Sequence, residues 1–310
     1  MSEQPIYDVL IIGGGPGGYT AALYCARAGM TVLVLEKLAA GGQMATTGQV
    51  DNYPGFEEGI DGFELGDRMR RGAERFGVRT RLAQVTAAHL TETPKRVETS
   101  EGEFLGRAVV IATGAYPREL GVAHENELRG RGVTYCATCD GMMYRGREVA
   151  VVGGGNSAVA DALVLAKYCK KVTLIHRRDT LRASKVYLEG LKRSGIDIRW
   201  NSRVKELLYE KRLTGVRLTD VKTGEESDLP CEGLFIAVGR VPDTELLRGQ
   251  VDMDESGYLL ADETTRTNLP GVYAVGDARA KPLRQIVTAT ADGAVASHFI
   301  EEYLMEEDGT

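Results

Sequence analysis

Residues 9–36 read VLIIGGGPGGYTAALYCARAGMTVLVLE, and they give the clearest indication of the fold class. The apolar run Val9–Ile12 leads into a glycine-rich turn at 13–18, a helical stretch follows, and a second apolar run ends at Glu36. Short apolar runs on either side of a glycine turn and a helical stretch predict strand, turn, helix and parallel strand. The sequence therefore predicts a βαβ unit near the start of the chain.

The same pattern returns without a gap at residues 149–176, which read VAVVGGGNSAVADALVLAKYCKKVTLIH. A repeat of a whole βαβ unit is too widely spaced for a solenoid. Apolar runs that end in tight turns also occur at 109–115, 233–239 and 271–277, and a last helix is expected from about Gln285 to Tyr303. We predict an α/β fold with two Rossmann-like dinucleotide-binding domains.

The first glycine turn carries the spacing of a dinucleotide fingerprint. Gly13 permits the tight turn, Gly15 lets backbone approach a pyrophosphate, and Gly18 lets the helix pack on the strand. Glu36 follows at the end of the second strand, where a carboxylate accepts hydrogen bonds from ribose hydroxyls and repels a 2′-phosphate. This site is expected to bind FAD or NAD rather than NADP; the alternative is a purely structural turn.

The second turn has the accepted variant Gly153-x-Gly155-x-x-Ala158 and opposite electrostatics. No acid ends its second strand; His176, Arg177 and Arg178 stand there instead, followed by Arg182. Guanidinium groups suit a phosphate monoester through charge and paired donors. We expect NADPH at this site, and a solvated basic patch is the alternative.

Cys136 and Cys139 form the one CxxC sequence, followed directly by Asp140. A disulfide over so short a loop contributes only about 2 kcal/mol of loop entropy, so it is better suited to redox chemistry than to stabilisation. Asp140 is expected to donate and accept the protons that sulfur exchanges. For this pair the alternatives are a zinc half-site, for which no second CxxC or spaced histidines exist, and two buried free thiols. The other cysteines, Cys25, Cys169 and Cys231, are expected to fill apolar positions.

Composition excludes several classes of protein. The chain has 310 residues, a net charge of −6 and a pI near 5.5, so it carries no nucleic-acid signal. Its apolar runs are too short to span a bilayer, and its start lacks a secretory signal, so we expect no membrane contact. Five cysteines are too few for a disulfide scaffold. These features predict a cytoplasmic protein without a metal.

The three sites together narrow the chemistry. A nicotinamide delivers a hydride, and a disulfide takes up two electrons and protons, so a flavin is needed between them. The first site is therefore expected to hold FAD and the second NADPH.

The whole chain resembles the low-molecular-weight thioredoxin reductases of bacteria. The motifs that carry the resemblance are GGGPGG at 13–18, GGQ at 41–43, DNYPG at 51–55, CATCDG at 136–141, GGGNSA at 153–158, HRRDTLR at 176–182, GD at 276–277 and RQ at 284–285. The resemblance implies a homodimer that reduces thioredoxin. It also implies an FAD domain in two parts, 1–116 and 242–310, around an NADPH domain at 117–241 that rotates between half-reactions about hinges at 116–117 and 239–242.

The resemblance also implies a set of site residues. The FAD contacts would be Gly13, Gly15, Pro16, Gly18, Glu36, Lys37, Gly42, Gln43, Asn52, Gly114, Asp277, Arg284 and Gln285. The NADPH contacts would be Gly153, Gly155, Asn156, Ser157, Ala158, His176, Arg177, Arg178, Arg182 and Arg240. Catalysis would rest on Cys136, Cys139 and Asp140, with Cys139 facing the flavin. A reductase of another thioredoxin-like protein or small disulfide, or one with a different electron donor, remains an alternative.

Overall fold

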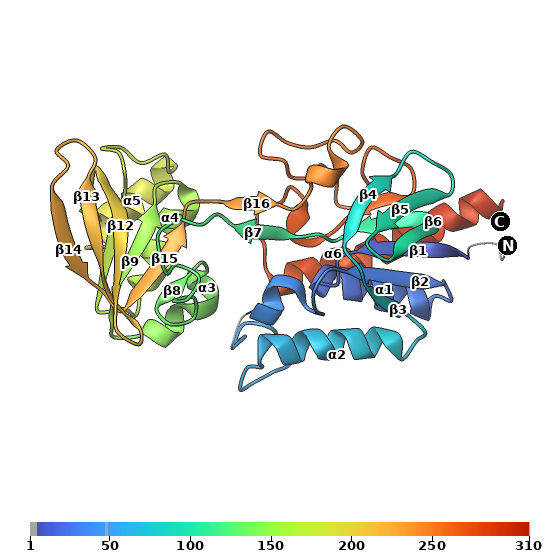
Figure 1. Ribbon diagram of the computed structural model, residues 1–310, viewed down its shortest axis with the longest axis horizontal. Coiled ribbons are helices and arrows are strands. Elements are labelled where there is room, and N and C mark those ends of the chain that lie inside the picture. Colours follow the sequence, from blue (N-terminus) through green and yellow to red (C-terminus); the bar gives the residue numbers. More distant parts are fainter. Residues whose placement is uncertain (1–4, 47–48, 310) are drawn as a thin grey trace. The chain divides into compact units, whose positions relative to one another are not determined.

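The chain forms two compact units in the computed structural model, which describes residues 5–46 and 49–309. The first unit joins the described residues up to Tyr116 to those from Val241 onward, and the second is the continuous segment Pro117–Arg240. Two short strands connect them, β7 (Ala115–Pro117) and β16 (Arg240–Pro242), and these pair with each other (Figure 1). The second unit is therefore an insertion in the first.

A seven-stranded sheet is the centre of the first unit. Its order is β3-β2-β1-β6-β5-β4, and β17 also pairs with β6. The strands β3, β2, β1, β6 and β17 run parallel, and β5 and β4 are antiparallel additions. The strands are β1 (Ile6–Ile12), β2 (Val32–Glu36), β3 (Arg79–Leu82), β4 (Val85–His89), β5 (Lys95–Thr99), β6 (Gly102–Ile111) and β17 (Val272–Ala274).

Both faces of this sheet are covered, which explains the continuous apolar runs. Val9 and Ile11 of β1 pack in one apolar cluster and Leu10 and Ile12 in another, and all four are buried. The helices α1 and α6 are in close contact at Gly293. A methyl group at this position would collide with a backbone oxygen of α1, so the close approach requires glycine. The helical elements are α1 (Pro16–Arg27), α2 (Gly62–Glu74), α6 (Ile286–Asp308), η1 (Gly42–Thr46), η3 (Glu245–Leu247) and η4 (Gly276–Ala278).

The second unit has its own parallel sheet, in the order β11-β10-β9-β15-β8, and a three-stranded antiparallel sheet, β12-β13-β14. The strands are β8 (Val133–Thr134), β9 (Glu148–Gly153), β10 (Lys171–Ile175), β11 (Asp197–Arg199), β12 (Ser202–Tyr209), β13 (Leu213–Asp220), β14 (Glu226–Pro230) and β15 (Gly233–Ala237). The helical elements are α3 (Ala137–Asp140), η2 (Gly141–Tyr144), α4 (Asn156–Leu165) and α5 (Lys185–Arg193).

The internal repeat is visible in the strand register. Val9 of β1 pairs with Val32 of β2, and Val149 of β9 pairs with Val172 of β10, which are the equivalent positions of the second copy. In each copy a helix follows the glycine turn directly. The predicted α/β fold with two dinucleotide-binding units is thus confirmed. The three-stranded sheet β12-β13-β14 was not among the predicted elements; it packs on the parallel sheet through a separate apolar cluster.

Candidate active site

The first glycine turn connects β1 to α1 with little room around its backbone, except at one position. A methyl group on Gly13 would collide with the carbonyl oxygen of Ala112, and one on Gly18 with that of Gly13. Gly15, the N-cap residue directly before α1, has no other atom within 4 Å of where its methyl would lie. An open space in front of a helix N-terminus is what a pyrophosphate needs. The backbone here therefore fits the dinucleotide that the sequence predicts.

Glu36 lies at the end of β2 with only 8% of its surface exposed. One carboxylate oxygen accepts a hydrogen bond of 2.7 Å from Gly14 N–H, and the other accepts one of 3.0 Å from Leu38 N–H. Each oxygen keeps a further lone pair, so the carboxylate can hold the turn and still accept ribose hydroxyls. Lys37 next to it is exposed.

Other predicted FAD contacts lie far from this turn in the sequence. In the fold they lie against the turn or against the start of α6. Gly41 N–H donates to the Gly14 carbonyl at 2.8 Å, so η1, with Gly42 and Gln43, lies against the turn. Asn52 Nδ2 donates to Gln285 Oε1 at 3.0 Å across 233 positions of sequence. Gly114 follows β6 with a φ of 75°, a left-handed conformation that favours glycine.

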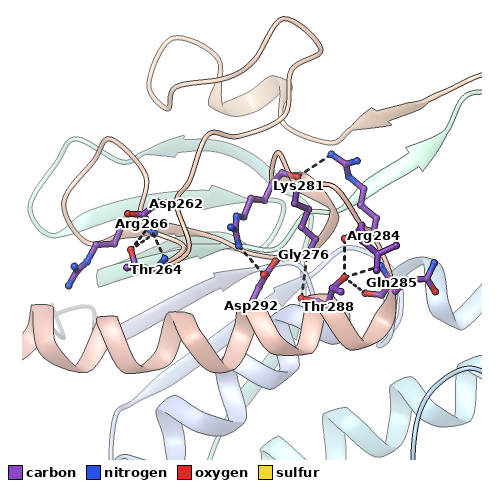
Figure 2. A network of polar contacts seen from close by, with 11 residues as sticks. Asp262, Thr264, Arg266, Gly276, Lys281, Arg284, Gln285, Thr288 and Asp292 are labelled. Atoms are coloured by element: carbon purple, nitrogen blue, oxygen red, sulfur yellow. Dashed lines mark hydrogen bonds and ion pairs between the residues drawn. The ribbon is translucent and has the colours of Figure 1, made fainter. Parts of the chain in front are cut away.

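The start of α6 is fixed by polar contacts (Figure 2). Gln285 caps the helix in a reciprocal box with Thr288, and Arg284 lies over the ring of Tyr258 at 3.9 Å. Arg284 also donates to the carbonyl oxygens of Asp277 and Arg279, at 3.4 and 3.2 Å. The predicted residues Asp277, Arg284 and Gln285 are therefore brought together by one folded segment.

Sequence reasoning missed the residues that hold this segment on α6. Asp292 accepts from Gly276 N–H at 2.9 Å, forms an ion pair with Lys281 at 2.6 Å, and forms another with Arg279 at 2.9 Å (Figure 2). All three side chains are at most 13% exposed. The signal that could have identified Asp292 is its position as the single acid in an apolar stretch of the last helix.

The second glycine turn repeats the geometry of the first. Gly153 is enclosed, since its methyl would collide with Ala158 and with the Ala237 carbonyl, whereas Gly155 again has open space in front of it. Asn156 and Ser157 begin α4 and are exposed, and Asn156 Oδ1 accepts from Ser184 N–H at 2.8 Å. This turn is likewise shaped to receive a pyrophosphate.

The basic segment after β10 divides into one buried ring and three exposed guanidinium groups. His176 is 9% exposed, and its ring nitrogens lie 2.9 Å from the Gly153 and Thr180 carbonyl oxygens, so the ring braces the glycine turn. Arg177, Arg178 and Arg182 are exposed, and within the described residues no hydrogen bond or ion pair engages their side chains. They are available to an anionic ligand.

Arg240, the remaining predicted NADPH contact, lies on the connecting strand β16. Its charge acts on Asp161 of α4, a residue that sequence reasoning did not single out. Burial raises the pKa of Asp161 to about 6, and the charge of Arg240 opposes that rise.

Cys136 and Cys139 are joined by a disulfide at the one-turn helix α3. Cys136 caps this helix, and its sulfur accepts a hydrogen bond of 3.1 Å from Cys139 N–H. A donor aimed at a sulfur favours its thiolate form. The free cysteines differ: burial raises the pKa of Cys25 and of Cys231 to about 12 and that of Cys169 to about 11. Cys136 and Cys139 therefore differ from the other three cysteines, which are free thiols with raised pKa values.

Asp140 ends α3, half-buried beside the disulfide. Burial raises the pKa of its carboxyl group, and a hydrogen bond from the Thr134 hydroxyl opposes that rise. A carboxyl group with a raised pKa can exchange protons closer to neutral pH, as general acid–base chemistry requires. Thr134 was missed from the sequence, because a threonine at a strand end is common and gives no signal.

Neither a metal site nor a membrane-spanning helix occurs in the described part of the chain. Among residues 5–46 and 49–309 no group of three or more histidine, cysteine or acidic side chains could hold a metal ion. Over the same ranges no helix is long and apolar enough to cross a membrane.

Comparison with known proteins places the chain in a family. Residues 7–293 match the family described as pyridine nucleotide-disulphide oxidoreductase. The chain belongs to this family. It is 46% identical over 307 residues to the thioredoxin reductase of Listeria monocytogenes, covering 98% of this chain and 96% of the relative. The predicted resemblance to bacterial thioredoxin reductases is confirmed.

Two further relatives extend the comparison. The crystal structure of thioredoxin reductase from Streptococcus pyogenes superposes with a TM-score of 0.90 at 42% identity, covering 97% of this chain and 99% of that one. A protein of Mycobacterium leprae named bifunctional thioredoxin reductase/thioredoxin is 44% identical over the full length of this chain, which covers 68% of the relative.

Proposed function

We propose that this chain is an NADPH-dependent, FAD-containing thioredoxin reductase. The observation that carries the proposal is the Cys136–Cys139 disulfide beside the half-buried Asp140, in a chain with two dinucleotide turns of opposite charge. The names of its relatives support thioredoxin, or a thioredoxin-like protein, as the acceptor.

In this proposal each unit holds one cofactor. The turn at 13–18 with Glu36 would hold FAD, and the turn at 153–158 with Arg177, Arg178 and Arg182 would hold the 2′-phosphate of NADPH. Bound FAD supplies the conversion of a hydride from nicotinamide into two electrons for a disulfide. The inserted unit would turn about β7 and β16 between the two half-reactions. We also propose that the enzyme is a cytoplasmic homodimer.

The cysteines and Asp140 would carry out the thiol chemistry. Reduction of the disulfide consumes two electrons and two protons and leaves two thiols. Cys136, whose sulfur faces Cys139 N–H, would give its thiol proton to the Asp140 carboxylate and attack the thioredoxin disulfide as a thiolate, and the departing thioredoxin sulfur would take that proton back from Asp140. Cys139 would then attack the Cys136 sulfur of the mixed disulfide and displace the second thioredoxin sulfur, which takes up the proton that Cys139 releases, so the Cys136–Cys139 disulfide is restored. Atoms and electrons balance, because the protein disulfide re-forms as the thioredoxin disulfide opens.

The experiment that tests this function is turnover of the purified flavoprotein, with NADPH or NADH as the donor and thioredoxin or a small disulfide as the acceptor, followed with a dithiol reporter. We expect wild type to turn over and Cys139→Ser to lose thioredoxin reduction, while NADPH still bleaches the flavin of the variant. Cys169→Ser is the matched control, since this half-buried thiol lies in the same unit and should leave turnover intact.

Each outcome of that experiment is decisive. Thioredoxin turnover by Cys139→Ser would exclude the cysteine relay. Wild type that ignores thioredoxin yet reduces a small disulfide would redirect the proposal to that acceptor, and equal turnover with NADH would remove NADPH as the preferred donor.

A further inference from the structure

We propose that Thr134 is a positioning residue for the redox pair, in which one hydroxyl oxygen holds both the Asp140 carboxylate and the backbone of Cys136. The inference rests on the proposed function and adds a residue to it. Its proposed effect on the sulfur chemistry is indirect and is transmitted by Asp140.

The contacts of Thr134 join the redox turn to the sheet. Its Oγ1 donates to Asp140 Oδ2 and accepts from Cys136 N–H at 3.4 Å. Asp140 N–H in turn donates to the Cys136 carbonyl at 3.0 Å, which closes the turn between them. Thr134 thus contacts both ends of the turn that carries the two cysteines.

Thr134 is suited to this task because its own position is fixed. It is 4% exposed and lies on β8, where it pairs with Phe235 of β15 in the parallel sheet. A hydroxyl has one proton and two lone pairs, so it can donate to a carboxylate and accept an N–H at the same time. Valine has nearly the same shape and favours strands but can do neither.

The hydroxyl also lowers the proton affinity of Asp140, against the effect of burial. Burial raises the pKa of the carboxyl group, and the Thr134 hydroxyl lowers it. Tyr144 on η2 interacts electrostatically with Asp140, Tyr168 lies beside Gly141 at the end of α3, and Asp161 lies on α4. Once the disulfide is reduced, the Cys136 and Cys139 thiols of the same turn titrate as well. Replacing Thr134 leaves these groups in place, so loss of the hydroxyl should raise the pKa of Asp140 further.

The test is the pH dependence of thioredoxin reduction by the holoenzyme, measured for wild type, Thr134→Val, Thr134→Ser and Asp140→Asn. The part of the rate-against-pH curve that reports the ionisation of Asp140 is the limb that disappears in Asp140→Asn. This limb should move to higher pH in Thr134→Val. At a pH on that limb the rate should change by roughly tenfold, as expected when a hydrogen bond to a charged group is lost. Thr134→Ser keeps the hydroxyl and should restore the wild-type limb.

A double variant distinguishes an effect that is transmitted through Asp140 from a nonspecific loss of structure in the redox turn. Thr134→Val should have no further effect on the profile in an Asp140→Asn background, because interacting residues are not additive. Thr173→Val, a buried threonine of the same sheet, is the control for loss of a hydroxyl and should leave the limb in place. Thr134→Ala gives the same comparison if Thr134→Val does not fold.

Two results would overturn the inference while the proposed function stands. One is an unmoved limb in Thr134→Val or Thr134→Ala, and the other is a change of rate caused by Thr134→Val in the Asp140→Asn background that is as large as in wild type. Failure of wild type to reduce thioredoxin would instead contradict the proposed function itself.

Discussion

At the level of single residues, the proposed preference for NADPH would depend on exposed arginines whose side chains make no hydrogen bond or ion pair within the described residues. Arg177 and Arg178 stand exposed after β10, where the first unit has the buried carboxylate of Glu36 at the equivalent strand end. A carboxylate repels a 2′-phosphate and a guanidinium binds it, so the same fold is expected to separate two dinucleotides by charge.

Replacing Arg177 and Arg178 by alanine should therefore raise the KM for NADPH at least about tenfold, because one hydrogen bond to a charged group contributes about 1.5–3 kcal/mol. The KM for NADH, which has no 2′-phosphate, should stay the same. Steady-state kinetics with both donors measure this. Arg193→Ala, an exposed arginine of α5, is the matched control. Equal losses with NADPH and NADH would contradict a phosphate contact.

Single residues that act through tertiary contacts were missed from the sequence. Asp292 binds Gly276 N–H and Lys281 only because the segment before α6 folds back on the helix. Thr134 meets Asp140 only because the redox turn closes. Glycine spacing, by contrast, is a local signal, so the sequence alone is enough to identify the fingerprint glycines of the first turn.

At the scale of elements, the two glycine turns offer a reciprocal test. Gly15 and Gly155 have φ angles of −79° and −95°, which alanine also adopts, and each has open space where a methyl group would lie. A methyl group there should spare the fold and obstruct only the ligand of its own unit.

Gly15→Ala should weaken FAD binding at least about tenfold and leave NADPH binding to the inserted unit unchanged; Gly155→Ala should do the reverse. The free energy of unfolding of the cofactor-free protein should stay constant or rise by up to about 1 kcal/mol. Titration of each cofactor by fluorescence measures the affinities. Loss of both cofactors in either variant would show that the turns do not serve separate ligands.

The βαβ repeat was predictable because a glycine turn between apolar runs is a short-range pattern. The three-stranded sheet was not, because its strands carry cross-strand ion pairs on an exposed face, such as Arg217 with Glu206 and Asp228. Charged residues there dilute the apolar alternation by which a strand is recognised.

For the molecule as a whole, the proposed function needs electrons to pass from one unit to the other. The glycine turn at 153–158, which we propose binds NADPH, belongs to the inserted unit, as does the disulfide. The glycine turn at 13–18, which we propose binds FAD, belongs to the other unit. Strand pairing also shows the insertion. β6 precedes the inserted unit in the sequence and β17 follows it, yet the two strands pair in the same sheet. The sequence repeat predicted two units of like design, and the implied role of each unit remains a proposal.

The most direct test of this route is an anaerobic reduction by NADPH in which flavin absorbance and free thiols are followed in the same sample. We expect two new thiols per chain in wild type and none in Cys139→Ser, with bleaching of the flavin in both. Bleaching of the wild-type flavin without any new thiol would contradict the passage of electrons to Cys136 and Cys139.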